Sequence, residues 1–379
     1  MRLAYISNYN AKDIKQFSGL GYHIAESLVQ QKLELTYIFP LIEKYSLLYK
    51  GKTYFYRKLL KKNYLRDREP TILKSYAKQV TRKLSSLKVD IIFSPGSIPI
   101  AYLESHHPIV FWSDATFANI VNFYPTYCNL CRETLENGHA MEKAALDRCS
   151  MAIYASIWAA QSAIKNYQIP AQKVKVVPFG GNIPTELTSR DIESLVKQRL
   201  HNQCHLLFIG RDWERKGGDI AVEVARELNK MGVRTQLTVL GCDEQQAKKF
   251  PNFVKYAGYA DKSTHEGMEK ITQLLAIAHF LILPSRAEAF GHVLCEANSF
   301  GVPCLVSNVG GLPTVIKDDV NGKIFPVDAK VSEYCEYISD LFYKPSEYQR
   351  IALSAFWEYK TRLNWFAAGK QVNKLLHEI

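Results

Sequence analysis

Short apolar runs alternate along this chain with longer stretches in which apolar residues recur every three or four positions. The short runs have the length of buried strands, and the longer stretches have the period of amphipathic helices. Regular alternation of the two predicts parallel sheets covered by helices on both faces, an α/β architecture. In the first half, the predicted strands are 3–7, 33–39, 91–93, 109–112, 151–154 and 174–177, and the clearest helices are 21–31, 71–87, 136–150 and 159–167.

The segment 178–184, Pro-Phe-Gly-Gly-Asn-Ile-Pro, interrupts every pattern and is predicted to be a domain linker. A second alternation follows, with strands at 206–209, 235–240, 280–283 and 304–307 and a short segment at 323–326. Its helices are 219–231, 264–278, one that runs through Glu296, and 363–377. We therefore predict two Rossmann-like, doubly wound domains, 1–182 and 183–360, facing a cleft between them. Residues 361–379 are predicted to form a helix that crosses back to the first domain.

Length and composition agree with this organisation. A chain of 379 residues is long enough for two cores, and 47% hydrophobic with 22% charged residues is typical of globular proteins. The most apolar stretch, 274–283, is too short to cross a bilayer, and the first residues lack the apolar core of a secretory signal. Of eight cysteines only Cys128 and Cys131 are close, without further ligands for zinc. We expect a cytoplasmic protein with reduced cysteines and no metal site.

The positive charge is concentrated in one segment. Residues 50–88 have 13 basic and 2 acidic side chains, a balance of +11, which equals the net charge of the whole chain. Basic and apolar residues interleave there, as in segments that lie on an anionic membrane face, and such a segment would make the protein peripheral on the inner face of a membrane. An acidic soluble ligand or an ordinary solvated helix surface would also fit. Nucleic acid is not expected, because no recognition motif accompanies the charge.

Two carboxylates stand eight positions apart near residue 290. Glu288 and Glu296 flank Phe290, Gly291 and His292, directly after the apolar run 280–283. The order predicts a buried strand, a turn and a helix whose first N–H groups favour an anion or a polyhydroxylated ligand. Each carboxylate can accept paired hydroxyl groups of a sugar. We interpret the segment as a nucleotide-sugar site.

A second loop offers cations. Gly210 and Arg211 follow the strand 206–209, and Lys216 precedes Gly217 and a helix. A guanidinium that can bind two oxygens and a mobile ammonium five positions on are suited to a diphosphate. Lysine–glycine turns are also common surface features. Together with the two glutamates at a neighbouring strand end, the loop favours a binding site.

Three further positions are candidates. Gly19, in a glycine-containing loop before the first helix, can offer an amide to a phosphate, although such a loop is also a common turn. Asp114 follows the strand 109–112 and could orient a hydroxyl or accept its proton, or cap a helix. The Gly310–Gly311 pair is expected near the nucleotide at the next strand end.

These motifs resemble those of the GT-B retaining glycosyltransferases of family 4, the glycosyl transferases group 1, over nearly the whole chain. The resemblance implies that Arg211 and Lys216 hold the donor diphosphate, Glu296 binds the ribose, and Glu288 binds the transferred sugar. It also implies that the amides of Phe290, Gly291 and His292 contact that sugar, and that Gly19 contacts the phosphates. Family members need no divalent metal or other cofactor; their donor is a UDP- or GDP-sugar and their acceptor a hydroxyl group.

The resemblance therefore implies a retaining hexosyltransferase acting on a glycan, glycolipid or small glycoside. A nucleotide-sugar 2-epimerase of the same fold and a non-catalytic sugar-binding relative are the alternatives, because a fold does not determine a function by itself.

Overall fold

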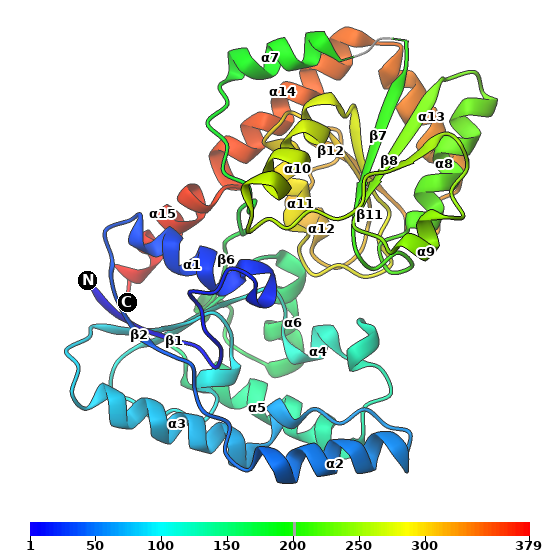
Figure 1. The fold of residues 1–379 in the computed structure, drawn as a ribbon. Coiled ribbons are helices and arrows are strands. Elements are labelled where there is room, and N and C mark those ends of the chain that lie inside the picture. Colours follow the sequence, from blue (N-terminus) through cyan, green and yellow to red (C-terminus); the bar gives the residue numbers. More distant parts are fainter. Residues whose placement is uncertain (200–201) are drawn as a thin grey trace. The chain divides into compact units, whose positions relative to one another are not determined.

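The computed structural model describes residues 1–199 and 202–379. The chain folds into two compact units, one formed by Met1–Pro178 with Ala368–Ile379 and the other by Phe179–Ala367 (Figure 1). Each unit contains a six-stranded sheet, and every strand pairing within both sheets is parallel. The predicted α/β class is confirmed.

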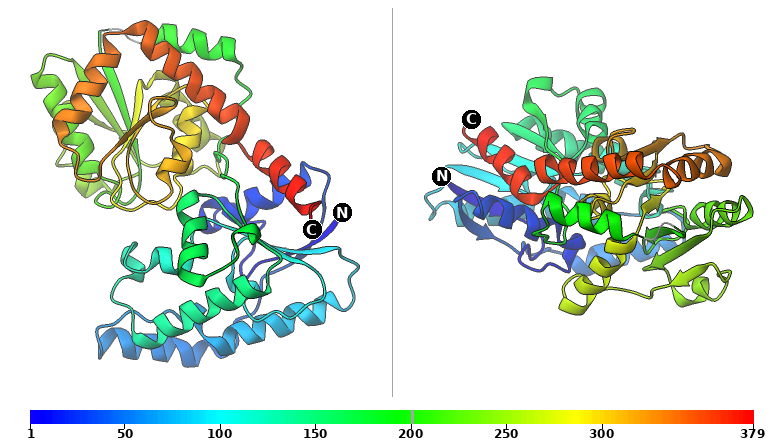
Figure 2. Two further views of the ribbon diagram at one scale, coloured as in Figure 1. Left: turned by 180° about the vertical axis from the view of Figure 1, so that it is seen from behind. Right: turned by 90° about the horizontal axis from the view of Figure 1, so that it is seen from above.

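The first unit has the strand order β2-β1-β3-β4-β5-β6. Helices cover both faces of this sheet: α1 lies on one face, and α3 and α5 lie on the other (Figures 1 and 2). Its strands are β1 Arg2–Ile6, β2 Glu34–Ile38, β3 Ile91–Ser94, β4 Ile109–Ser113, β5 Met151–Tyr154 and β6 Val174–Val176. Its helices are α1 Leu20–Val29, α2 Ser46–Lys58, α3 Pro70–Leu84, α4 Phe117–Ile120, α5 Arg132–Arg148 and α6 Ile157–Tyr167.

The second unit has the strand order β12-β11-β10-β7-β8-β9. Its strands are β7 Cys204–Ile209, β8 Thr235–Leu240, β9 Val254–Tyr256, β10 Phe280–Leu283, β11 Cys304–Ser307 and β12 Gly322–Phe325. Its helices are α7 Ser189–Gln198, α8 Gly218–Lys230, α9 Glu244–Ala247, α10 His265–Ile277, α11 His292–Asn298, α12 Leu312–Val315, α13 Val331–Phe342 and α14 Pro345–Arg362. The last helix, α15 Trp365–Leu376, begins in this unit and continues in the first from Ala368.

The central strands are buried along their length, and this explains why apolar runs in the sequence predicted them well. All four residues of β3, β5, β10 and β11 are buried, as expected for parallel strands covered on both faces. At the sheet edge, β2 is only partly buried. All ten predicted strands are present, with ends that differ by at most two residues, and the short segment 323–326 overlaps β12. The sequence pattern did not predict β9, which has three residues and a single buried position, Val254.

The division between the units falls after Pro178, four residues before the predicted boundary. Phe179 is fully buried in the second unit, where its ring stacks on Trp365 at 5.5 Å. The indole Nε1 of Trp365 donates a hydrogen bond to Oδ1 of Asn182 at 3.0 Å. The glycine-rich stretch is therefore packed into the second unit and does not act as a free linker.

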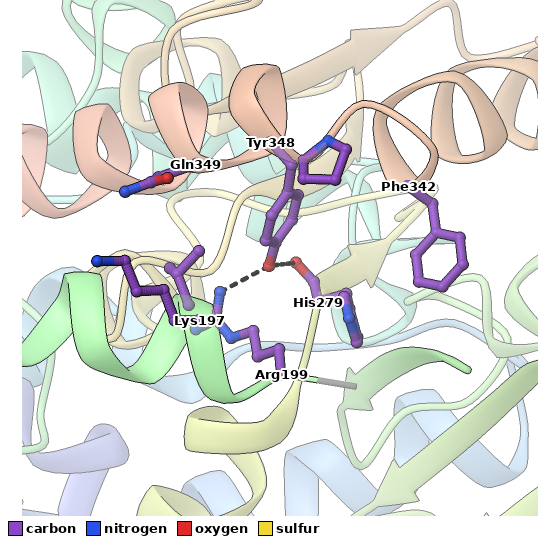
Figure 3. A pocket seen from close by; sticks show the side chains of 8 residues that line it. Lys197, Arg199, His279, Phe342, Tyr348 and Gln349 are labelled. Carbon is purple, nitrogen blue, oxygen red and sulfur yellow. Dashed lines mark hydrogen bonds between the residues drawn. The ribbon is translucent and has the colours of Figure 1, made fainter. Parts of the chain in front are cut away.

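Buried Arg199, just after α7, connects three elements of the second unit. Its guanidinium donates a hydrogen bond to the Tyr348 hydroxyl at 2.6 Å (Figure 3). It also donates to the carbonyl oxygens of Gly301 and Phe300 at 2.9 and 2.8 Å. The Tyr348 hydroxyl in turn donates to the carbonyl of His279 at 2.9 Å. A cavity of about 140 Å³ adjoins this network, and no residue of the predicted donor site lines it.

We expect Arg199→Ala to lower the free energy of unfolding by about 3 kcal/mol or more, because it leaves two buried carbonyls and one hydroxyl without their donor. Chemical denaturation of the variant measures this change. Lys197→Ala, an exposed neighbour at the end of the same helix, is the matched control and should change stability by less than about 0.5 kcal/mol. Equal stability of the two variants would contradict the role of Arg199.

Candidate functional site

The order of strands in the second unit brings the two predicted motifs together. Strand β7 pairs directly with β10, although some 70 residues separate them in the sequence. The segment 210–217 leaves the carboxyl end of β7, and the segment 284–291 leaves the carboxyl end of β10. In a parallel sheet these ends share one edge, which is where ligands of doubly wound sheets bind.

Two glycines allow the first of these segments to approach its neighbours closely. A Cβ atom at Gly210 would lie 2.4 Å from Cδ of Lys216, so a side chain there would displace the lysine. Gly217 has a φ of +74°, and a Cβ there would lie 2.1 Å from the carbonyl oxygen of Pro284. Both constraints favour glycine: Gly210 leaves room for the Lys216 side chain, and a side chain at Gly217 would push this segment away from Pro284 in the other one.

Lys216 and Glu288 form an ion pair at the centre of this edge. Nζ of Lys216 lies 2.8 Å from Oε2 of Glu288, and Nη1 of Arg215 lies 3.4 Å from the same oxygen. The Glu288 side chain is only 12% exposed. Burial by itself raises the pKa of Glu288, but Lys216 and Arg215 outweigh burial and hold that pKa below the ordinary glutamate value. Glu288 is therefore a carboxylate at neutral pH.

Arg215 and Arg286, which the sequence analysis did not single out, join the two segments. Arg215 also donates to the carbonyl of Ala287 at 2.6 Å. Arg286 makes a two-point ion pair with Asp219 in the first turn of α8, at 2.9 and 2.6 Å. Its backbone amide donates to the Arg215 carbonyl at 2.7 Å. The only signal in the sequence is a set of arginines in loops, which does not identify their partners.

Glu296 lies on α11 and is fully buried. The ammonium of Lys262 bonds both carboxylate oxygens, at 2.5 and 2.6 Å, and the amide of Asn182 donates to Oε1 at 3.1 Å. Gly181 makes this approach possible, since a Cβ there would lie 3.1 Å from Cγ of Glu296. Lys262 is a member of the site that the sequence analysis missed, because it lies in a loop of ordinary composition.

Arg211 is placed differently from Lys216. It is exposed, and its guanidinium lies over the ring of Tyr259 at 4.3 Å from the ring centre. Among the ion pairs of the described residues, none involves Arg211. Tyr259 and Lys262 belong to the same loop between β9 and α10, so this loop contacts both Arg211 and Glu296. Of the four charged residues predicted from the sequence, Lys216 and Glu288 thus contact each other directly. Arg211 and Glu296 both contact the loop between β9 and α10.

The next residues predicted to bind the sugar donor, Phe290, Gly291 and His292, follow Glu288 closely in the chain. Gly291, with a φ of +87°, precedes the short helix α11. The ring of His292 stacks on Phe179 at 5.6 Å and donates through Nδ1 to the Gly180 carbonyl at 2.9 Å. Burial lowers the pKa of His292, so the ring is neutral at pH 7. Phe290 packs edge-on against Phe179 at 5.2 Å.

The Gly310–Gly311 pair lies against the same segment. The amide of Gly311 donates to the carbonyl of Glu288 at 3.1 Å. Gly310 has a φ of +54°, a conformation that favours glycine. The structure therefore places the Gly310–Gly311 loop beside Glu288, and its contact with a nucleotide remains a prediction.

In the first unit, Gly19 and Asp114 lie in the loops that follow β1 and β4, on the side of the strands' carboxyl ends. Gly19 has a φ of +77° and follows two residues with positive φ, Phe17 and Ser18, in the loop between β1 and α1. Asp114 directly follows β4, and Thr116, not Asp114, caps α4. Burial raises the pKa of Tyr9 to about 12, and the charge of Asp114 contributes to this rise. The roles of Gly19 and Asp114 in a ligand site remain predictions.

We expect Lys262→Ala to lower the free energy of unfolding by about 2–3 kcal/mol, because among the described residues it leaves the buried Glu296 carboxylate only the amide of Asn182 as a hydrogen-bond donor. The expected loss of stability is smaller than for a fully buried ion pair, because the Lys262 side chain is about a third exposed to solvent. In a Glu296→Gln background the same lysine substitution should cost well under 1 kcal/mol, since no buried charge is left behind. Denaturation of the four proteins of this double-mutant cycle measures the difference. Additive losses would contradict a buried pair.

Within the described residues, no group of three or more histidine, cysteine or acidic side chains is arranged to hold a metal ion. No helix of the described residues has both the length and the apolar character that crossing a bilayer requires.

Comparison with known proteins shows which fold this chain has. The chain superimposes over its whole length on Alr3699/HepE of Anabaena in complex with UDP, with a TM-score of 0.66 at 16% identity and complete coverage of both chains. It also superimposes on sucrose-phosphate synthase of Thermosynechococcus elongatus, with a TM-score of 0.68 at 15% identity, over 100% of this chain and 98% of the other. The fold is that of the GT-B glycosyltransferases.

The family model described as glycosyl transferases group 1 matches residues 191–355. This match lies within the second unit, which contains the motifs that resemble the family. The chain is 31% identical over 193 residues to D-inositol 3-phosphate glycosyltransferase of Paenarthrobacter aurescens, covering 48% of this chain and 46% of that protein. It is 24% identical over 218 residues to alpha-D-kanosaminyltransferase of Streptomyces kanamyceticus, covering 56% of each. The chain thus spans about half the length of the curated relatives that it matches.

Proposed function

We propose that this protein is a glycosyltransferase that moves a hexosyl group from a UDP- or GDP-sugar to a hydroxyl acceptor, with retention of the anomeric configuration and without a metal. The observation that supports this most is the Lys216–Glu288 ion pair at the shared edge of β7 and β10, in a unit that matches a glycosyltransferase family.

The charges of this edge suit a nucleotide sugar better than any single ion. Lys216 and Glu288 are largely buried and satisfy one another. A nucleotide sugar offers an anion for the ammonium and hydroxyl donors for the carboxylate, so it can replace both partners at once. Arg211, which has no carboxylate partner among the described residues, supplies a second cation for the diphosphate.

Glu296 would bind the ribose hydroxyls by the same exchange of partners, with Lys262 moving from the carboxylate toward the phosphates or the solvent. Lys216, Arg211 and Lys262 are three cations around one edge, which is the charge that a diphosphate leaving group needs when no metal is bound. The structurally similar Alr3699/HepE is described in complex with UDP-glucose, which favours UDP-sugars as the first donors to test.

In the proposed reaction the bond between the anomeric carbon and the diphosphate breaks, and a bond from the acceptor oxygen forms on the same face. The acceptor proton passes to an oxygen of the departing diphosphate. Lys216 and Arg211 stabilise the negative charge that develops on that group. Glu288 holds the sugar in position through its hydroxyls.

A panel of UDP-, GDP- and ADP-sugars tests this proposal, with EDTA present throughout. We expect one donor to raise the melting temperature and to release nucleotide when mixed hydroxyl acceptors are supplied, and we expect the product to retain its anomeric configuration by NMR. Conversion of the donor sugar without an acceptor would instead indicate a 2-epimerase. Binding without any turnover would indicate a non-catalytic relative, and absence of binding by every nucleotide sugar would overturn the assignment of the site.

A further inference from the structure

Exposed apolar side chains are concentrated in one short part of the first unit. Of the nineteen large apolar side chains that are exposed among the described residues, eight lie between positions 42 and 60. Leu47 is 82% exposed, and Leu48, Tyr54 and Leu59 are 66–69% exposed. A group of this size in one short segment marks a contact surface, because isolated exposed apolar residues are ordinary and clusters are not.

Four of these eight residues lie on helix α2, which is held to the first unit by its opposite face. Buried Tyr49 lies on this inner face. Lys52 bonds Glu69 at 3.0 Å and Glu133 at 2.5 Å, and the Tyr56 hydroxyl donates to Glu133 at 3.0 Å. The helix lies along the outside of the first unit, with its other face turned away from the sheet (Figures 1 and 2). The exposed apolar residues are therefore not the packing stripe of α2.

The outer face of α2 combines apolar and cationic residues in a fixed arrangement. Leu47, Leu48 and Phe55 recur at helical spacing and form its apolar part. Lys50, Arg57 and Lys58 are exposed on the same outer side, and none of them forms an ion pair with a described residue. From residue 44 to residue 66 the chain has no acidic residue. We refer to these six side chains as the α2 outer face.

We propose that the α2 outer face binds the surface of an anionic lipid bilayer, with α2 lying in the plane of the membrane. The apolar side chains enter the boundary between headgroups and acyl chains, and the three cations bind the lipid phosphates. This inference is independent of the chemistry proposed for the second unit.

The composition of the face favours a bilayer over other partners. A two-fold contact with a second copy would bring Lys50, Arg57 and Lys58 against identical cations, which is unfavourable. An acidic soluble ligand would satisfy the cations but leave Leu47, Leu48 and Phe55 in water. Only an anionic bilayer offers negative charge and an apolar layer within the depth of one helix.

Only part of the basic segment 50–88 combines cations with exposed apolar side chains. The cations Lys78, Arg82 and Lys83 on α3 are exposed, but no large apolar side chain is exposed between residues 61 and 156. The α3 cations therefore lack the second component of a membrane contact. They provide a matched control for the loss of three positive charges in the same unit.

Flotation with vesicles of phosphatidylcholine, with and without phosphatidylglycerol, tests the proposal on the full chain. We expect binding only to the anionic vesicles, weakened severalfold or more when NaCl rises from about 0.05 to about 0.5 M. Replacing Lys50, Arg57 and Lys58 together by Gln should weaken binding about a hundredfold, and the triple replacement of Lys78, Arg82 and Lys83 by Gln much less.

The apolar part is tested by replacing Leu47, Leu48 and Phe55 together by Ser, which should weaken binding about tenfold or more. Trp357→Ser, at a side chain 64% exposed in the second unit, is the control and should leave binding unchanged. Circular dichroism checks that each variant is folded, as expected for substitutions on an exposed face. Absence of binding to anionic vesicles, or equal effects of the α2 and α3 triple variants, would overturn the proposal. Dimers that the apolar triple variant abolishes would indicate a second copy instead.

Discussion

Lys216→Ala is expected to lower turnover by about a hundredfold or more, the usual effect of removing a group that stabilises charge in a transition state. The ammonium of Lys216 is held at the sheet edge by Glu288, and Gly210 leaves the space through which its side chain passes. In the proposed reaction this ammonium neutralises the diphosphate as it leaves, so its loss should reduce kcat as well as affinity for the donor.

Initial rates with the donor identified by the panel measure this effect. Lys230→Ala is the matched control, because Lys230 is an exposed lysine of the neighbouring helix, paired only with Glu227 on the surface. Thermal unfolding of the Lys216 variant separates a loss of chemistry from a loss of fold, since Arg215 remains near Glu288. Full activity of a folded Lys216→Ala protein would show that the diphosphate is bound elsewhere.

Glu288→Ala is also expected to lower turnover by about a hundredfold or more, through loss of the contacts that position the transferred sugar. The nearly isosteric Glu288→Gln keeps the shape of the side chain but removes its charge, and it leaves Lys216 and Arg215 facing a neutral amide. A larger effect on kcat for Ala than for Gln would indicate that hydrogen bonding to the sugar matters more than charge.

The Gln variant also has a pH signature. The pKa of Glu288 is lower in the folded protein than its ordinary value of 4.5, so the ionised carboxylate contributes stability that is fully present above that value. This contribution is lost as the pH falls through the folded pKa. The difference in unfolding free energy between the wild type and Glu288→Gln should therefore be constant near neutrality and shrink below about pH 4.5. A difference that grows at acid pH would contradict the ion pair.

Several elements and contacts escaped the sequence analysis for identifiable reasons. Helix α7 was not predicted, although its capping box, in which Thr188 and Asp191 bond each other's backbone amides, has a recognisable sequence. Strand β9 has too few apolar residues for a periodic signal. Arg199 and Arg286 look like surface arginines in the sequence, and only their partners show that they join distant segments.

The sequence by itself determined the alternation of strands and helices, the two doubly wound units and the two loops in which the charged candidates lie, because apolar periodicity and glycine positions are local properties. The tertiary structure decided which charges meet. Lys216 contacts Glu288 because β7 and β10 are neighbours in the sheet, and Lys262 contacts Glu296 because a loop without a distinctive motif folds over α11. It likewise decided that the outer face of α2 stays exposed, since burial depends on packing against Glu69 and Glu133, which local sequence does not specify.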